Sequence, residues 1–414
     1  MTASTPSAAK AGGANQPGPS QGGVIQYVQR HWVAVVVLAL VIAFPFLDFT
    51  SDAVTHVTVL VNAGVFVLMA LGLNIVVGYA GLLDLGYVAF FTLGAYSYAM
   101  ANFGNIIRTK SGIAYQVPGQ TIPGTPITLS VWPMLLGGLV VAAVFGILLG
   151  APTLRLRGDY LAIVTLGFGE IVPIIFHNNA ALGGAFGFTG LDLPSSIPTP
   201  LGPIKFSFLN QVTFYYFILI LCLLAVLLVL SIRNSRFGRA WIAIREDETA
   251  AAASGVNLVR TKLLAFAMGA SLGGLAGVFY ASHLTTVTYD QFDFSISIYV
   301  LVMVVLGGMG SIPGVIAGAV VVYFVNSYVL GYLNNTLHDH NILVNFDFSQ
   351  IRNLLYGLVL ILMMILRPEG LIPSARRRQE LHTFEQRTDE GAVEALDAPP
   401  GLGVVGNPDG QLEE

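Results

Sequence analysis

Charged side chains are scarce in this chain: Asp, Glu, Lys and Arg make up 10% of its 414 residues. Soluble domains carry about 25% charged residues, whereas hydrophobic residues here reach 55%. This composition excludes an ordinary soluble domain and predicts an integral membrane protein. The formal net charge is −4 and no strongly basic region is present, so we expect no nucleic-acid partner.

The chain also lacks the residue patterns on which most catalysis and metal binding depend. Cys222 is the single cysteine, so no disulfide can form within the chain. The P-loop and H-E-x-x-H motifs are absent, and no G-x-S-x-G or G-x-G-x-x-G stands in a strand–helix context. His338-Asp339-His340 offers too few clustered ligands for a metal. We therefore predict no enzymatic activity, no cofactor and no metal.

Long apolar segments are what the sequence does contain, and a helix needs about 20 such residues to cross a bilayer. We predict an all-α, polytopic bundle of about ten transmembrane helices, some of them broken. The ten segments are Trp32–Leu47, Val54–Val77, Leu85–Phe103, Val131–Gly150, Tyr160–Phe176, Thr213–Ile232, Leu263–Ser282, Ile296–Leu306, Ile312–Leu330 and Ile351–Leu366.

Three regions follow from these segments: a disordered tail over 1–30, a membrane domain over 31–372 and a disordered, acidic tail over 373–414. Cytoplasmic loops are enriched in Lys and Arg. The predicted helices between successive Arg clusters are even in number, so all of these clusters lie on the same side of the membrane. We therefore predict that both termini and the loop after Ile232 are cytoplasmic. Arg108 and Lys110 are the misfit to this orientation.

Two glycine-rich breaks interrupt the apolar pattern: GYAGLLDLG over 78–86 and GGMGSIPG over 307–314. The run Ile296–Leu306 before the second break is about 16 Å long at 1.5 Å per residue, which is too short to span. Such paired breaks in a transporter point to a midplane pathway. Gly81, Gly86, Gly308 and Gly310 are the glycines that we place there.

Three polar residues lie in or beside apolar segments, where acids are costly and mark candidate functional sites. Asp84 either lines a hydrated pathway or caps a helix that begins near Leu85. Glu170 is expected to face the interior of the bundle, with Arg155 and Arg157 as candidate partners. Asn74 joins the candidate pathway residues, although hydrogen bonding between helices is its simpler role.

The segment 238–255, GRAWIAIREDETAAAASG, differs from its surroundings because it is polar and rich in alanine. Ala favours a helix and Gly255 a helix end. A simpler alternative is a loop helix lying on the membrane, but we predict one helix that docks a partner on the aqueous side. The docking residues are predicted to be Arg239, Arg245, Glu246, Asp247, Glu248, Ala250, Ala251 and Gly255. On the other side, Tyr289, Asp290, Phe292 and Asp293 are expected to meet a soluble partner.

Four blocks in order, Leu71–Tyr96, Leu154–Val172, Gly238–Asn257 and Val305–Ala319, resemble the Liv-type permease subunits of ABC importers for branched-chain amino acids, of the LivM branch. The resemblance implies that 238–255 is a coupling helix that fits a groove of an ATP-binding subunit. It further implies two ATP-binding subunits, a second homologous permease, a periplasmic or extracellular substrate-binding protein and a small-molecule substrate, all at the lipid of a prokaryotic inner (plasma) membrane.

The resemblance leaves the cargo open, because the same superfamily includes importers of urea and short-chain amides. A secondary transporter driven by ions through Asp84 and Glu170 is the alternative from another class.

Overall fold

The computed structural model describes residues 32–47, 53–102, 107–109, 112–114, 130–153, 159–196, 205–207, 210–330, 348–367 and 370–372. Both predicted tails and the sequence 338–340 lie outside these ranges. The chain divides into two compact units, Met1–Ala53 and Val54–Glu414. The described part of the first unit is dominated by one apolar helix, α2 (Trp32–Leu47), which has Pro45 near its end.

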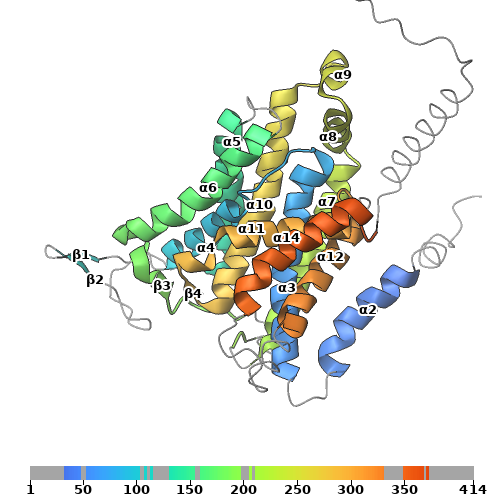
Figure 1. The fold of residues 1–414 in the computed structure, drawn as a ribbon. Coiled ribbons are helices and arrows are strands. Elements are labelled where there is room, and N and C mark those ends of the chain that lie inside the picture. The colour runs from blue at the N-terminus through green and yellow to red at the C-terminus, as the bar shows by residue number, and fades with distance from the viewer. Residues whose placement is uncertain are drawn as a thin grey trace, which may run out of the picture. The chain divides into compact units, whose positions relative to one another are not determined.

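The second unit is a bundle of helices (Figure 1). It begins with α3 (Ala53–Leu73), which continues into the π-helical segment η1 (Asn74–Tyr79). The helices that follow are α4 (Val88–Asn102), α5 (Val131–Thr153), α6 (Asp159–Asn178), α7 (Gln211–Arg233), α8 (Arg236–Glu246), α9 (Glu248–Ala253), α10 (Leu258–Leu284), α11 (Phe294–Gly307), α12 (Ile312–Phe324), followed by the π-helical η5 (Val325–Leu330), and α14 (Phe348–Leu366).

Six helices among the described residues are long and apolar enough to cross a membrane. They are Thr55–Tyr79, Val131–Thr153, Tyr160–Asn178, Gln211–Arg233, Leu258–Leu284 and Tyr289–Gly307. The prediction of ten crossings is therefore not matched by this criterion, because the remaining predicted segments form shorter helices or fall partly outside the described residues. The helix before the second break, α11, has 14 residues, and it reaches the length of a candidate span only together with the preceding turn that begins at Tyr289.

The helix α10 forms the centre of the bundle, packed between α4 and α5. Its glycines allow this close approach, as the small-residue pattern predicts. A methyl group added at Gly277 would lie 2.1 Å from the Phe91 carbonyl oxygen, and one added at Gly94 would lie 2.1 Å from the Gly274 carbonyl oxygen. The helices α4 and α10 therefore pack backbone against backbone at these glycines.

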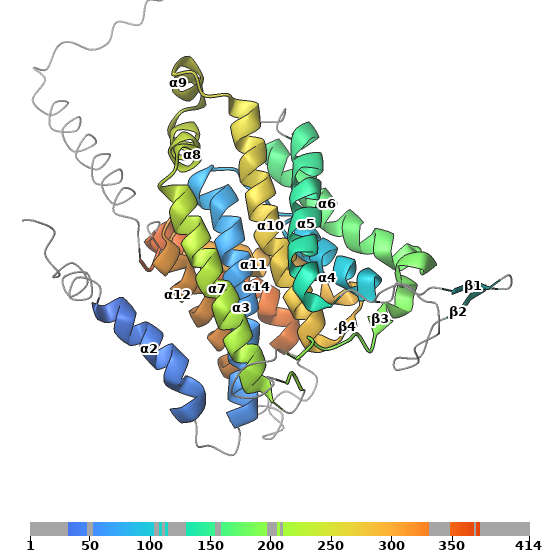
Figure 2. The ribbon, with the colours of Figure 1, turned by 180° about the vertical axis from the view of Figure 1, so that it is seen from behind.

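Two pairs of short antiparallel strands complete the fold: β1 (Ile107–Thr109) with β2 (Gly112–Ala114), and β3 (Phe188–Thr189) with β4 (Thr286–Val287). The second pair joins the loop after α6 to the loop after α10. The helices α8 and α9 lie at the opposite end of the bundle from β3 and β4, as both views show (Figures 1 and 2). This agrees with the predicted topology, which places these two loops together and the charged segment on the other side.

Candidate functional site at the helix breaks and the charged segment

The first break follows α3 and η1, where residues 80–87 are non-helical and lead to α4. It begins at the end of a complete span, beside α8 (Figure 1), and not in the middle of a membrane helix. Gly81 has φ +70°, a left-handed conformation that favours glycine. The first break therefore begins where a candidate span ends, and its predicted place in a midplane pathway stays a prediction.

The two breaks meet through Asn74, which is fully buried. Its Oδ1 accepts a hydrogen bond of 2.8 Å from the backbone N–H of Gly310, 236 residues away. Gly78 packs against the same pair, since a methyl group at Gly78 would lie 2.1 Å from Asn74 Oδ1 and 2.7 Å from Gly310 N. Asn74 thus forms a hydrogen bond to a distant segment, but its partner lies in the second break and not in a helix as predicted. The bond joins two of the predicted pathway positions, Asn74 and Gly310.

In the second break, Gly308 and Gly310 both have positive φ, +112° and +83°. Ser311 then caps α12, its hydroxyl oxygen accepting the Gly314 N–H at 3.3 Å. Residues 370–372 cover this break: the N–H of Leu371 donates to Leu306 O at 2.8 Å, and Gly370 packs on Gly308. Gly308 thus contacts the segment after α14.

Asp84 is buried, with 2% of its surface exposed, and it does not cap a helix at Leu85. Its Oδ1 accepts the N–H of Gly86 at 3.0 Å, which forms a local turn. The helix α4 begins only at Val88, whose N–H donates to the hydroxyl of Ser297 on α11 at 3.0 Å. The capping group therefore comes from a distant helix, and sequence spacing gave no signal for it.

Gly86 lies directly against α6, because a methyl group there would lie 1.8 Å from the Thr165 carbonyl oxygen. The Thr165 hydroxyl accepts the Leu85 N–H at 3.1 Å, which fixes this contact. Glu170, further along α6, is exposed. The prediction that Glu170 faces the interior of this chain is wrong, and its candidate partners Arg155 and Arg157 lie outside the described residues.

The charged segment forms two helices, α8 and α9, and not the single helix predicted. Asp247 interrupts it in an extended conformation (φ −155°, ψ 114°) and caps α9, accepting the N–H groups of Thr249 and Ala250 at 2.7 and 3.1 Å. The hydroxyl of Thr249 also donates to Asp247, and these hydrogen bonds lower the pKa of the Asp247 carboxyl. Gly255, at φ +85°, follows the end of α9, as predicted.

Several contacts fasten α8 and α9 to the start of α10. Trp241 is fully buried, and its Nε1 donates to Thr261 O at 2.7 Å. Lys262 Nζ and Glu248 Oε1 form a salt bridge of 2.6 Å. Ala251 is also buried, at 3% exposed. Glu248 and Ala251, both predicted to dock a partner, are thus engaged within the chain.

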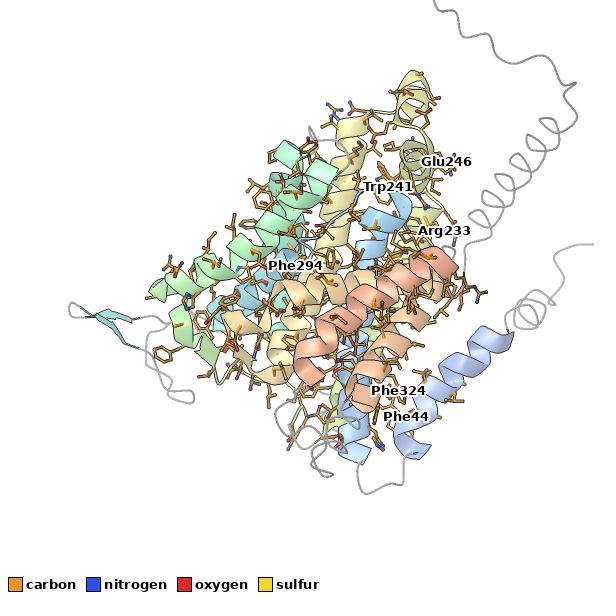
Figure 3. All side chains as sticks on the ribbon, viewed as in Figure 1. Phe44, Arg233, Trp241, Glu246, Phe294 and Phe324 are labelled. Carbon is orange, nitrogen blue, oxygen red and sulfur yellow. The ribbon has the colours of Figure 1, made fainter. Side chains whose placement is uncertain are left out.

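All of the predicted docking residues except Ala251 are exposed: Arg239, Arg245, Glu246, Asp247, Glu248, Ala250 and Gly255. Glu246 lies on α8 with the buried Trp241 one and a half turns earlier (Figure 3). The exposed side chains and backbone at this end of the bundle therefore remain accessible to a partner.

Arg245 connects α8 to the first break, a contact that the sequence did not reveal. Its Nη1 donates to the carbonyl oxygen of Gly78 at 2.6 Å. Its aliphatic stem lies against Gly81, where an added methyl group would lie 2.8 Å from Arg245 Cγ. The charged segment and the breaks, treated as separate features in the sequence, are thus one continuous site.

At the opposite end, the predicted partner surface is only partly available. Asp290 and Asp293 are exposed, but Phe292 is fully buried and packs with Phe91 at a ring-centroid distance of 5.3 Å. The expected exposure of Phe292 is wrong because its ring packs among the rings of Phe91, Tyr96 and Tyr280. Among the described residues, no three His, Cys, Asp or Glu side chains are grouped so as to hold a metal.

Comparison with known proteins decides the family. The family described as branched-chain amino acid transport system / permease component matches residues 55–366, which hold both breaks and the charged segment. The chain belongs to this family. As a member of this family it is a multi-pass membrane protein, and the relatives it resembles are transport permease subunits.

The two LivM relatives described here match most of the chain. The high-affinity branched-chain amino acid transport system permease protein LivM of Salmonella typhimurium LT2 is 34% identical over 381 residues, 88% of this chain and 80% of the relative. LivM of Escherichia coli K12 is 34% identical over 372 residues, 86% and 77% of the two chains. LivH of the same organism is 30% identical over 145 residues, 35% and 42%. No solved structure matches the chain.

Proposed function

We propose that this permease is the transmembrane subunit of an ATP-driven ABC importer that moves leucine, isoleucine and valine into the cell by alternating access. The observation that carries the proposal is the similarity to LivM over 88% of the chain. ATP hydrolysis then belongs to partner subunits, because this chain has no P-loop.

The α8–α9 segment (Arg236–Ala253) is the proposed docking surface for one of two ATP-binding subunits. Its exposed charges, Arg239 and Glu246, offer specific ion pairs. The exposed small residues Ala250, Ala252 and Ala253, with Ser254 and Gly255 just after them, allow a partner backbone to come close. The internal contacts of Trp241 and Glu248 support this role, since a surface that transmits force needs a firm attachment to its own subunit.

A second, homologous permease completes the proposed membrane part, with the substrate path between the two subunits. The partial similarity to LivH supports such a pair. Exposure of Glu170 on α6 fits a path at the surface of this chain, because an acid facing lipid is costly. The residues of the two breaks, together with Asn74, then lie beside the path and shape it as hinges and contacts. They are Asn74, Gly81, Asp84, Gly86, Gly308 and Gly310.

A substrate-binding protein outside the membrane is proposed to deliver the cargo at the β3–β4 end, where Asp290 and Asp293 are exposed. The termini and α8–α9 lie on the cytoplasmic side of a prokaryotic inner (plasma) membrane. We assign no function to residues 1–30 and 373–414.

The cargo is tested by uptake into proteoliposomes that contain the complete importer and its binding protein. We expect ATP-dependent accumulation of labelled leucine and none of labelled urea. Urea or short-chain amide uptake without leucine uptake would overturn the proposed cargo while leaving the architecture. This alternative stays relevant because a more distant relative, the ribose import permease RbsC of Haemophilus influenzae, is 24% identical over 75% of this chain.

A further inference from the structure

Three segments that are distant in sequence converge on the guanidinium of Arg245. Its Nη1 donates to Gly78 O in η1, directly before the first break, at 2.6 Å. The second break lies beside the same group, since a methyl group at Gly310 would lie 3.4 Å from Gly78 O and 3.5 Å from Arg245 Nη1. Asn74 then ties Gly310 back to the first break.

The chemistry of this contact suits a firm connection. The last carbonyls of a helix have no partner within the helix, and Gly78 lies in the last turn of η1. A cation at this end is also favoured by the helix dipole, and a hydrogen bond from a charged donor is stronger than one between neutral groups. Arg245 therefore caps the α3–η1 helix from a different element, α8.

The packing of the stem restricts how Arg245 can move. Gly81 leaves room for Cγ only because it has no side chain, as the distance of 2.8 Å to an added methyl group shows. Displacing α8 must either pull Gly78 along or break the hydrogen bond.

We propose that Arg245 is a positioning residue that transmits movement of the α8–α9 segment to both helix breaks. Arg245 is exposed like Arg239 and Glu246, but its guanidinium donates to Gly78 O within the chain, whereas we assign the contacts with the ATP-binding subunit to Arg239 and Glu246. The inference rests on the proposed function, because it takes that subunit as the source of the movement.

The test compares Arg245→Gln, Arg245→Lys and the wild type in the complete importer, with Arg260→Gln on exposed α10 surface as the matched control. Arg245→Gln is expected to keep copurification with the ATP-binding subunits and ATP hydrolysis. Leucine taken up per ATP hydrolysed should fall about tenfold, within the usual range of coupling energies. Arg245→Lys, which can still donate to Gly78 O, should recover part of this ratio, and Arg260→Gln should match the wild type.

A second readout follows the first break directly. A spin label at Leu83→Cys, in a Cys222→Ser background, sits on an exposed residue of the break. We expect ATP with vanadate to change its mobility in the wild type and to have no such effect in Arg245→Gln. Gly81→Ala crowds the Arg245 stem from the other side, so we expect the same uptake ratio and the same label response as in Arg245→Gln. It replaces the Arg245 variants in both measurements if those fail to insert into the membrane.

A wild-type uptake ratio and an unchanged Leu83 response in Arg245→Gln would overturn the inference. Loss of copurification would also overturn it, because Arg245 would then be a docking contact. Failure of the wild type itself to couple ATP to uptake would instead refute the proposed function. In that event the Leu83 label without nucleotide still tests the inference. Loss of the hydrogen bond to Gly78 O should raise the mobility of the label in Arg245→Gln, and equal mobility in the two proteins would refute the inference.

Discussion

At the scale of single residues, Gly86 decides how closely the first break approaches α6. Gly86→Ala would place a methyl group 1.8 Å from the Thr165 carbonyl oxygen. Overpacking of this kind costs about 1–3 kcal/mol, so we expect a lower melting temperature for the purified protein. Gly167→Ala on α6 is the control, since nothing lies within 4 Å of its added methyl group. Equal melting temperatures for the two variants would contradict this packing.

The salt bridge between Glu248 and Lys262 is the second test at this scale. Glu248→Lys should release α9 from α10 and speed its hydrogen exchange by about fivefold, because a half-exposed pair contributes up to about 1 kcal/mol. The double variant Glu248→Lys with Lys262→Glu should restore slow exchange. Glu246→Lys, an exposed position on α8, should leave exchange in α9 unchanged. Fast exchange in the double variant would argue against the pair.

Residue chemistry could be predicted from sequence where it is local, and partners could not. Asn74 was expected to bond between helices, but Gly310, its partner, lies 236 residues away and no spacing rule connects them. Arg245 was assigned to docking because it belongs to a charged run, whereas it reaches Gly78. Glu170 is predicted to face the interior of the bundle because an acidic side chain in a membrane segment avoids lipid. This rule does not distinguish burial within the same chain from burial against a second subunit.

At the scale of elements, the division between α8 and α9 depends on Asp247. Asp247→Ala removes the acceptor for the Thr249 and Ala250 N–H groups, so we expect faster hydrogen exchange over α9. Asp247→Asn keeps an acceptor and should exchange like the wild type. Loss of protection equal in both variants would contradict the capping role.

The same carboxylate gives a pH dependence with a defined sign. Its hydrogen bonds lower its pKa below the ordinary 3.8, so the folded segment favours the charged form. The cap is complete above the ordinary pKa and is lost as the pH falls through the lowered one. Protection of α9 should fall in that acidic window in the wild type and not in Asp247→Asn, as measured by hydrogen exchange.

Helix boundaries were predictable where an apolar run ends in a glycine or a charge. The predicted segment Val131–Gly150 corresponds to α5, and Thr213–Ile232 to α7, each within a few residues. The start of α4 was missed by three residues because its first N–H is satisfied by Ser297. The single charged helix was wrong because the alanine run hid the capping preference of Asp247.

At the scale of the whole molecule, hydrophobicity alone identified a helical membrane protein and its two breaks. The contacts that connect these breaks to the α8–α9 segment are tertiary contacts between distant residues. The helical periodicity of 3.6 residues in the sequence does not predict them. Family membership, shown by the match over residues 55–366, adds the class of transporter. It does not by itself establish where the energy comes from.

The most direct measurement is leucine uptake into proteoliposomes made with and without the ATP-binding subunits. We predict accumulation only when those subunits, ATP and the binding protein are all present, and none under an ion gradient alone. Uptake by the permeases without any ATP-binding subunit, driven by a proton or sodium gradient, would contradict the account.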